Sequence, residues 1–225
     1  LSGRAPDRRG LIAAAAAAEM IHTATLIHDD IIDQSTRRRR KPAFHRRWGT
    51  ERAVLTGDYL YASAFTLLAR LRQPAPLCIM ADVCRQLSRG ELLEVDARFR
   101  LDLTEREYLA IIRDKTASLI AGCCRMGASL SGASRASVRR LSAFGLNIGM
   151  AFQIVDDCLD LTGDPRRLGK SIYADLDKGA LSLPLIYLAE SLSARARRRF
   201  FRPLRERGSD PAFLADVAKA AQATG

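Results

Sequence analysis

Two acidic triplets in apolar helical surroundings constrain this chain more than any other feature of its sequence. Each triplet has the spacing i, i+1, i+4, and the six carboxylates are Asp29, Asp30 and Asp33, then Asp156, Asp157 and Asp160. On an α-helix of about 3.6 residues per turn, the first and last carboxylates of a triplet project from one face. Like charges at that spacing repel each other, and the apolar approach Ala24–Ile27 makes a fully solvated acidic face a poor explanation.

A hard divalent cation resolves this repulsion. Mg²⁺ takes carboxylate oxygens and shares its remaining positions with phosphate and water. Four consecutive arginines, Arg37–Arg40, follow the first triplet, and guanidinium groups bind phosphate oxygens in pairs. One such triplet is a weak signal, but two copies, each followed by basic residues, indicate a metal-assisted site for a polyanion such as a diphosphate.

The rest of the sequence predicts helix after helix, without a run of alternating strand pattern. Helices are expected over 11–33, 50–71, 77–98, 104–130 and 134–161, followed by a loop over 163–182 and shorter helices from Pro184 onward. Thr104 and Glu107 form a capping box that opens the fourth of these helices. A chain of 225 residues can bury one sizeable core, so a single all-α domain over residues 1–225 is expected.

The charge and the cysteine content indicate which classes of partner and which cellular compartment suit this chain. The net charge of +11 is carried mostly by scattered arginines with few aromatic residues between them, which argues against nucleic acid as a partner. A cluster of basic side chains near the C-terminus suits peripheral contact with an anionic membrane: Arg195, Arg197, Arg198, Arg199, Arg202, Arg205 and Arg207. No uninterrupted apolar run approaches the roughly 20 residues of a membrane span. The five cysteines form no CxxC pair, which is typical of buried thiols in a reducing cytoplasm.

Six stretches, in this order and spacing, resemble the trans-isoprenyl diphosphate synthases, the polyprenyl synthetase family, over about residues 11–190. They are Ile21–Asp33, Val54–Leu60, Asp114–Ala117, Gly149–Asp157, Leu168–Lys170 and Leu183–Ile186. The resemblance implies an all-α barrel or bundle of helices around a deep central cavity, usually as a homodimer. It also implies head-to-tail condensation of isopentenyl diphosphate with an allylic diphosphate such as farnesyl or geranylgeranyl diphosphate.

The resemblance also implies a role for each site residue. Two to three Mg²⁺ ions would be held by the two triplets, with Asp30 and Asp157 as ligands or as supporting partners of ligands. Arg38, Lys115 and Lys170 would neutralise the allylic diphosphate, and Thr116 and Gln153 would donate hydrogen bonds near its reacting end. His22 and Arg39 would hold isopentenyl diphosphate. His28 and His45 are expected to be structural histidines.

Product length is predicted from the helix before the first triplet. Large aromatic residues four or five positions before it stop chain growth early in this family, whereas this chain has Thr25 and Ala24 there. Ile21 lies one turn deeper. We therefore expect an open tunnel and a long product of the kind used as a quinone side chain, and Ala24→Phe is expected to shorten it. A floor on another helix remains the alternative.

The chain departs from the family pattern in one important place. The Gly-Gly-Lys-x-x-Arg-Pro stretch that grips isopentenyl diphosphate is not found, so either the N-terminal helices are absent from this chain or this member is defective. Three further classes stay open: a short-chain (C15–C20) synthase, a non-catalytic partner subunit of a heteromeric synthase, and a related terpene cyclase or squalene-type synthase. Intact triplets argue against the partner subunit, and Arg38, Arg39, Lys115 and Thr116 argue against the cyclase.

Overall fold

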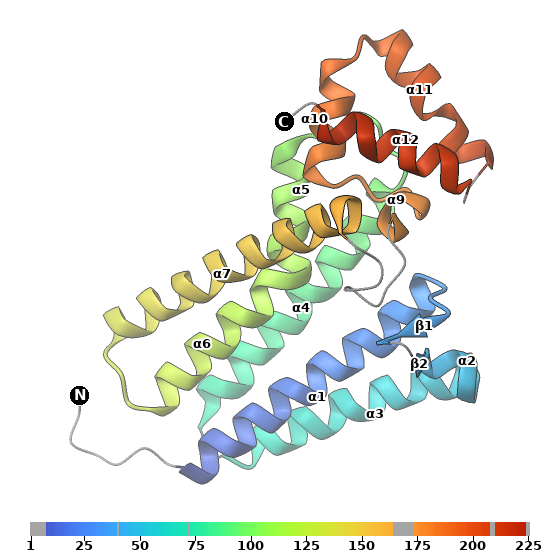
Figure 1. Cartoon of the computed structure of the whole chain (residues 1–225). Coiled ribbons are helices and arrows are strands. Elements are labelled where there is room, and N and C mark those ends of the chain that lie inside the picture. Colours follow the sequence, from blue (N-terminus) through green and yellow to red (C-terminus); the bar gives the residue numbers. More distant parts are fainter. Residues whose placement is uncertain (1–7, 40, 72, 164–172, 208–209, 224–225) are drawn as a thin grey trace. The chain divides into compact units, whose positions relative to one another are not determined.

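A computed structural model describes residues 8–39, 41–71, 73–163, 173–207 and 210–223. These residues form an almost entirely helical structure, which confirms the predicted all-α class (Figure 1). The helices are α1 (Arg8–Ile32), α2 (Phe44–Trp48), α3 (Thr50–Ala69), α4 (Pro74–Ala97), α5 (Glu105–Ile112), the π-helix η1 (Arg113–Ala117), α6 (Ser118–Leu130), α7 (Arg135–Thr162), α9 (Ala174–Asp177), α10 (Leu183–Ser191), α11 (Ala194–Arg207) and α12 (Pro211–Gln222). The five long predicted helices are thus present, with ends shifted by a few residues.

The chain divides into two compact units. Unit 1 comprises residues 1–88 and 115–149, and unit 2 comprises residues 89–114 and 150–225. Helices α4 and α7 each contribute one part to unit 1 and the other part to unit 2. A single domain over residues 1–225 stays a prediction, as does the central cavity.

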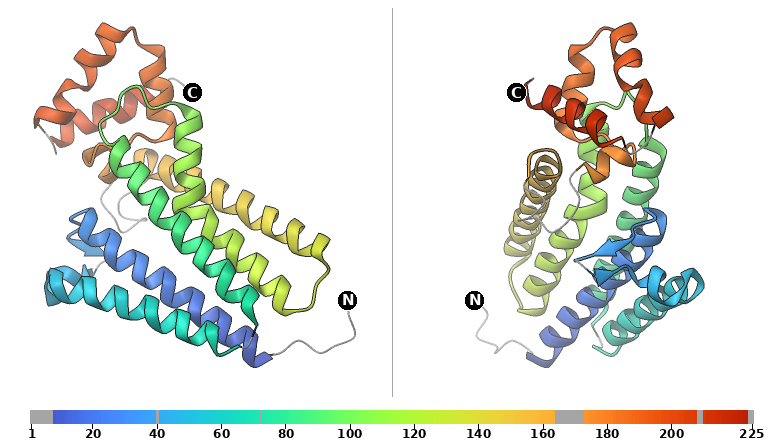
Figure 2. Two further views of the ribbon diagram at one scale, coloured as in Figure 1. Left: turned by 180° about the vertical axis from the view of Figure 1, so that it is seen from behind. Right: turned by 45° about the vertical axis from the view of Figure 1, so that its right-hand side comes forward.

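Unit 1 is built on the pairing of α1 with α3, which lie side by side in all three views (Figures 1 and 2). The buried face of α1 is made of small side chains at helical spacing, Ala14, Ala17, Ile21 and Ala24. Gly57 of α3 lets the two helices approach closely, because a β-carbon there would clash with the ring of His28. The His28 Nε2 atom lies 3.1 Å from the Val54 carbonyl oxygen, so this histidine links α1 to α3.

By length and composition alone, α1 could cross a membrane. Its composition has another explanation within unit 1, where the buried face of the helix belongs to a hydrophobic core shared with α3, α4 and α6. The carboxylates Asp29 and Asp30 occupy its last turn. The packing is therefore that of a core helix.

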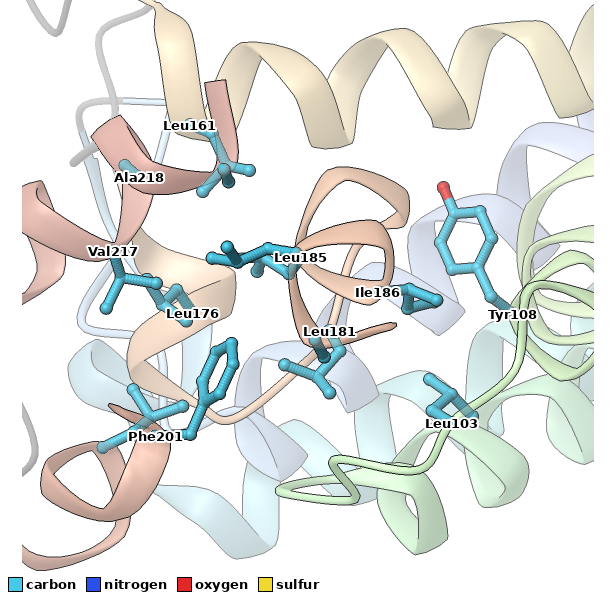
Figure 3. Close-up of a cluster of buried hydrophobic side chains, with 14 of the residues drawn as sticks. Leu103, Tyr108, Leu161, Leu176, Leu181, Leu185, Ile186, Phe201, Val217 and Ala218 are labelled. Carbon is cyan, nitrogen blue, oxygen red and sulfur yellow. The ribbon is translucent and has the colours of Figure 1, made fainter. Parts of the chain in front are cut away.

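Unit 2 has a separate hydrophobic core formed by α10, α11 and α12 together with α5 and neighbouring segments (Figure 3). Leu176, Leu185 and Val217 are fully buried in it. Pro184 and Pro211 lie in the first turns of α10 and α12, where a missing backbone N–H costs nothing. This core fixes α5 beside the elements that carry the second acidic triplet.

Two local features differ from the sequence prediction. Residues Arg37–Arg38 (β1) and Lys41–Pro42 (β2) pair as a short antiparallel hairpin in a region where no strand was expected. The helix predicted over 104–130 is interrupted by the five-residue π-helix η1. The predicted loop over 163–182 contains the short helix α9, and residues 164–172 lie outside the described part of the chain.

Candidate functional site

Four predicted site residues share one face of α1 and of the turn that follows it. His22, Thr25 and Asp29 of the helix and Asp33 of the turn follow one another at spacings of three or four residues, and each is half-buried. The Asp33 backbone N–H still donates to the Asp29 carbonyl at 2.8 Å, so the helical spacing extends to this residue. This face is distinct from the buried alanine face of α1. Asp29 and Asp33 lie one turn apart on the half-buried face, as predicted, and their role as metal ligands stays a prediction.

Asp30 lies on a different side of α1 and is bound within the protein. The residue is only 2% exposed, and its Oδ1 atom accepts a 2.9 Å hydrogen bond from Nε of Arg38 and lies 2.9 Å from Arg38 Nη2 in the same ion pair. The β1–β2 hairpin brings Arg38 back to the end of α1. Asp30 is thus paired with Arg38, and its predicted role as a metal ligand or as a supporting partner of ligands stays a prediction.

Arg39 follows Arg38 at the turn of the hairpin with a φ of 47°. A positive φ is uncommon for a residue other than glycine, and it costs energy that the surrounding structure must supply. Arg39 is exposed, whereas Arg38 is half-buried and bonded to Asp30. Arg40 lies outside the described residues.

Lys115 and Thr116 lie in the π-helix η1, and both are half-buried. π-Helical turns are rare and are found frequently at functional sites. Asp114, the residue before Lys115, is 1% exposed, and its Oδ2 atom accepts a 2.6 Å hydrogen bond from Nε of Arg89. Sequence reasoning missed this ion pair, because Asp114 and Arg89 belong to no recognisable charge pattern.

The backbone around η1 is also closely packed within unit 1. A β-carbon on Gly149 of α7 would clash with Ala117, the last residue of the π-helix. Gly149 opens the sequence stretch that carries the second triplet. The close approach explains why a glycine fits at this position of α7.

The second acidic triplet lies at the C-terminal end of α7, in unit 2. Asp156 is half-buried, whereas Asp157 and Asp160 are buried. The Oδ2 atom of Asp160 accepts a hydrogen bond from the backbone N–H of Asp175 at 3.2 Å, so the turn at α9 contacts the triplet. Lys170 lies outside the described residues, and its predicted contact with the allylic diphosphate stays a prediction.

Asp157 is the centre of a hydrogen-bond network. Its Oδ2 atom accepts a 2.6 Å hydrogen bond from the Tyr108 hydroxyl, and its Oδ1 atom accepts one of 2.7 Å from the Gln153 side-chain amide. Burial raises the pKa of this carboxyl to about 6, and the two donors oppose that shift. Like Asp30, the middle carboxylate of the second triplet is engaged inside the protein.

The three predicted chain-length residues have different surroundings. Ile21 and Ala24 are fully buried in unit 1, on the side of α1 that packs against neighbouring helices. Thr25 is half-buried, and its hydroxyl donates a 2.7 Å hydrogen bond to the His22 carbonyl. Among these three residues, Thr25 is the one on the face shared with Asp29.

The chemistry of the donor set suits Mg²⁺. The candidate ligands are carboxylates, which are the hard oxygen donors that this ion prefers. Within the described residues, no three His, Cys, Asp or Glu side chains gather into a group that could hold a metal by itself.

Comparison with known proteins gives consistent matches over most of the chain. A family model described as polyprenyl synthetase matches residues 2–221. Heptaprenyl diphosphate synthase component 2 from Geobacillus stearothermophilus is 42% identical over 77% of this chain, and the match covers 54% of that protein. A short chain isoprenyl diphosphate synthase from Methanothermobacter thermautotrophicus is 40% identical over 82% of this chain and 58% of its own length. The chain thus spans little more than half the length of these curated relatives.

A solved structure extends the match to the fold. The polyprenyl synthase from Caulobacter crescentus CB15, crystallised as a complex with calcium and isoprenyl diphosphate, superposes with a TM-score of 0.91 at 36% identity. The superposition covers 98% of this chain and 67% of that one. The predicted fold class is thereby supported by an experimental structure as well as by the helical pattern.

Proposed function

This chain belongs to the polyprenyl synthetase family, and on that basis we propose that it condenses isopentenyl diphosphate head-to-tail with an allylic diphosphate. The observation that carries the proposal is the contrast between the carboxylates of the first acidic triplet. Asp30 is buried and paired with Arg38, while Asp29 and Asp33 are half-buried and lie one turn apart. In the second triplet, Asp157 and Asp160 are both buried and accept hydrogen bonds within the protein, while Asp156 is half-buried. This arrangement supports Asp29 and Asp33 as carboxylates that bind Mg²⁺-diphosphate.

The residues around the allylic diphosphate would stabilise the negative charge that develops on this leaving group. Bound Mg²⁺, two to three ions held by Asp29, Asp33, Asp156 and Asp160, would supply electrostatic stabilisation of the charge that grows on the diphosphate. Arg38, oriented by Asp30, and the lysines Lys115 and Lys170 would neutralise the same oxygens. Thr116 and Gln153 would hydrogen-bond near the bond that breaks.

The second substrate attacks the allylic cation left by this departure. His22 and Arg39 would hold the diphosphate of isopentenyl diphosphate, whose double bond forms the new carbon–carbon bond. The product then loses a proton, for which the released diphosphate is the base. Exclusion of water from the reacting carbons prevents quenching of the cation.

We propose a long all-trans product for a quinone side chain, because Thr25 and Ala24 are small. The relatives include both a heptaprenyl and a short chain synthase, so a C15–C20 product is the competing outcome. The heptaprenyl relative is named as one component of its enzyme, which gives the partner-subunit hypothesis its support. Against that hypothesis stand two complete acidic triplets.

The deciding experiment measures incorporation of labelled isopentenyl diphosphate by the full-length protein, with farnesyl diphosphate and Mg²⁺, and resolves the products by length. Long polyprenyl products support the whole proposal, and a C20 product supports the reaction but contradicts the long chain. The variant Asp29→Asn/Asp33→Asn should lose activity by at least a hundredfold, since removal of one electrostatic partner of developing charge commonly costs about 10²–10³ in rate. The matched variant Asp82→Asn, which changes an exposed aspartate of α4, should remain active. Absence of any product from the full-length protein would contradict the proposed reaction.

The proposed partners are the two diphosphate substrates and a second copy of the chain, in the cytoplasm and without nucleic acid. We also propose peripheral contact with anionic membrane through the exposed side of α11. Phe201 and Leu204 of this helix are buried. The exposed side carries arginines at i, i+3, i+4 and i+7 spacing, namely Arg195, Arg198, Arg199 and Arg202. Sedimentation with vesicles that contain phosphatidylglycerol tests this contact, and equal binding after substitution of all four by Gln would contradict it.

A further inference from the structure

A buried tyrosine reaches the second acidic triplet from another part of unit 2. Tyr108 belongs to α5, and it is 3% exposed in the unit-2 core to which Ile186 also belongs (Figure 3). Its hydroxyl donates to Asp157 Oδ2 at 2.6 Å across a sequence separation of 49 residues. The ring is therefore held by apolar packing, while its one polar atom is held by the carboxylate.

The network fixes the orientation of Gln153. A carboxylate accepts hydrogen bonds and donates none, so the 2.7 Å contact with Asp157 Oδ1 identifies the Gln153 NH₂ group as the donor. The amide oxygen of Gln153 therefore points away from Asp157. Each oxygen of Asp157 has its own donor, so rotation of the carboxylate would break both hydrogen bonds together.

We propose that Tyr108 is a positioning residue for the condensation reaction, acting through Asp157 to hold Gln153 in its working orientation. This inference rests on the proposed function, in which Gln153 hydrogen-bonds near the reacting end of the allylic substrate. Tyr108 itself touches no substrate in this scheme. Its hydroxyl locks the carboxylate, and the locked carboxylate sets the plane of the amide.

The capping box explains how α5 presents the tyrosine. Thr104 and Glu107 close the N-terminus of α5 with reciprocal hydrogen bonds, so the helix begins at a fixed residue. Tyr108 lies directly after this box, with its backbone N–H bonded to the Thr104 carbonyl at 3.0 Å. The position of the hydroxyl is therefore set by the helix start as well as by the core.

The test is Tyr108→Phe, which removes the hydroxyl and keeps the ring that fills the core. We expect kcat to fall roughly tenfold or more, the scale of one lost hydrogen bond to a charged group, with KM for isopentenyl diphosphate changed less than twofold. The matched control is Tyr187→Phe, because the Tyr187 hydroxyl also donates to a carboxylate, Glu105 Oε2 at 3.1 Å, but lies on the exposed side of α10. This control should keep wild-type kcat.

A double-mutant cycle separates positioning from a general effect on stability. In an Asp157→Ala background, Tyr108→Phe should change kcat less than twofold, because the side chain that links Tyr108 to Gln153 is absent. Circular dichroism establishes that each variant is folded at the assay temperature. Wild-type kcat in a folded Tyr108→Phe variant, or effects of the two substitutions that simply multiply, would overturn the proposal.

A binding measurement tests the role of Tyr108 separately from the proposed condensation reaction. Binding of Mg²⁺ and inorganic diphosphate, measured by titration calorimetry, is followed through the same cycle of Tyr108 and Asp157 variants. If the wild type binds diphosphate but condenses nothing, the proposed reaction fails, and coupling in the binding cycle still tests the network. Absence of coupling in that measurement contradicts the positioning role.

Discussion

Thr104 shows how one side chain sets both the start of a helix and its response to pH. Its hydroxyl accepts the Glu107 backbone N–H and donates to Glu107 Oε2, and its own backbone N–H donates to the same carboxylate. These hydrogen bonds, together with Arg100, lower the pKa of Glu107 from 4.5 to about 2. The stabilisation is therefore present above pH 4.5 and is lost as the pH falls toward 2.

We expect Thr104→Ala to lower the free energy of unfolding by about 1 kcal/mol at pH 7, the usual cost of a lost N-cap. The difference from wild type should shrink as the pH falls from 5 to 3, and urea unfolding at both values measures it. The control is Ser134→Ala, which removes the Ser134 contact with the Ser137 backbone N–H at the start of α7 and involves no carboxylate. A Thr104→Ala effect that is constant between pH 5 and pH 3 would contradict the role assigned to Glu107.

The ion pair between Arg89 and Asp114 of the π-helix gives a second residue-scale prediction. Arg89→Leu leaves the buried Asp114 carboxylate with Arg113 Nε at 3.4 Å as a remaining cationic neighbour. Loss of a hydrogen-bonded partner of a buried charge should lower the free energy of unfolding by about 1–3 kcal/mol. The control Arg85→Leu removes an exposed pair with Asp82, which contributes about 0–1 kcal/mol. Equal effects of the two substitutions in chemical denaturation would show that Asp114 does not depend on Arg89.

At the scale of the helices, the contact of α1 with α3 depends on the absence of a side chain at Gly57. We expect Gly57→Ala to lower the free energy of unfolding by about 1–3 kcal/mol, because the new methyl group must displace the His28 ring. Gly127→Ala in α6 is the matched control, since a β-carbon there meets no atom within 4 Å. That substitution should stabilise the protein by about 0.5–1 kcal/mol through helix propensity. Thermal melts of both variants should therefore shift in opposite directions.

The sequence predicts the helical elements well because their signals are local. The capping box at Thr104 and the apolar spacing of α1 involve residues within one or two turns of each other, and both features are present in the structure. The hairpin at Arg37–Pro42 could not be predicted in this way, because a run of arginines has no strand pattern. The hydrogen bond between Tyr108 and Asp157 could not be predicted either, because it joins residues that are 49 positions apart in the sequence. The π-helix could not be predicted, because nothing in the propensity of its five residues distinguishes them from those of an α-helix.

For the molecule as a whole, product length is the property that most needs a direct test. We expect Thr25→Phe to shorten the products, because this position lies on the face of α1 that carries Asp29 and has accessible surface. It is a cleaner probe than Ala24→Phe, since Ala24 is fully buried and a phenylalanine there would also overpack unit 1.

The control for product length is Thr66→Phe, an exposed position of α3 whose hydroxyl makes a similar helix hydrogen bond, to the Ala62 carbonyl at 2.8 Å. Chromatography of labelled products compares the two variants. An unchanged product distribution in a folded, active Thr25→Phe variant would contradict the proposed tunnel along α1.

The π-helix η1 also affects where the length of this chain can vary during evolution. Deletion of one residue from a continuous helix turns every later side chain by about 100° relative to the earlier ones. The π-helix has i→i+5 hydrogen bonds, so loss of one residue within η1 can restore the i→i+4 pattern of an α-helix and keep the direction of the side chains that follow. Within α6 the same deletion would turn Met126 and Leu130, which are buried in unit 1, relative to the start of that helix. Single-residue deletions should therefore be tolerated at η1 and in surface turns such as that after Leu130, but selected against within α6.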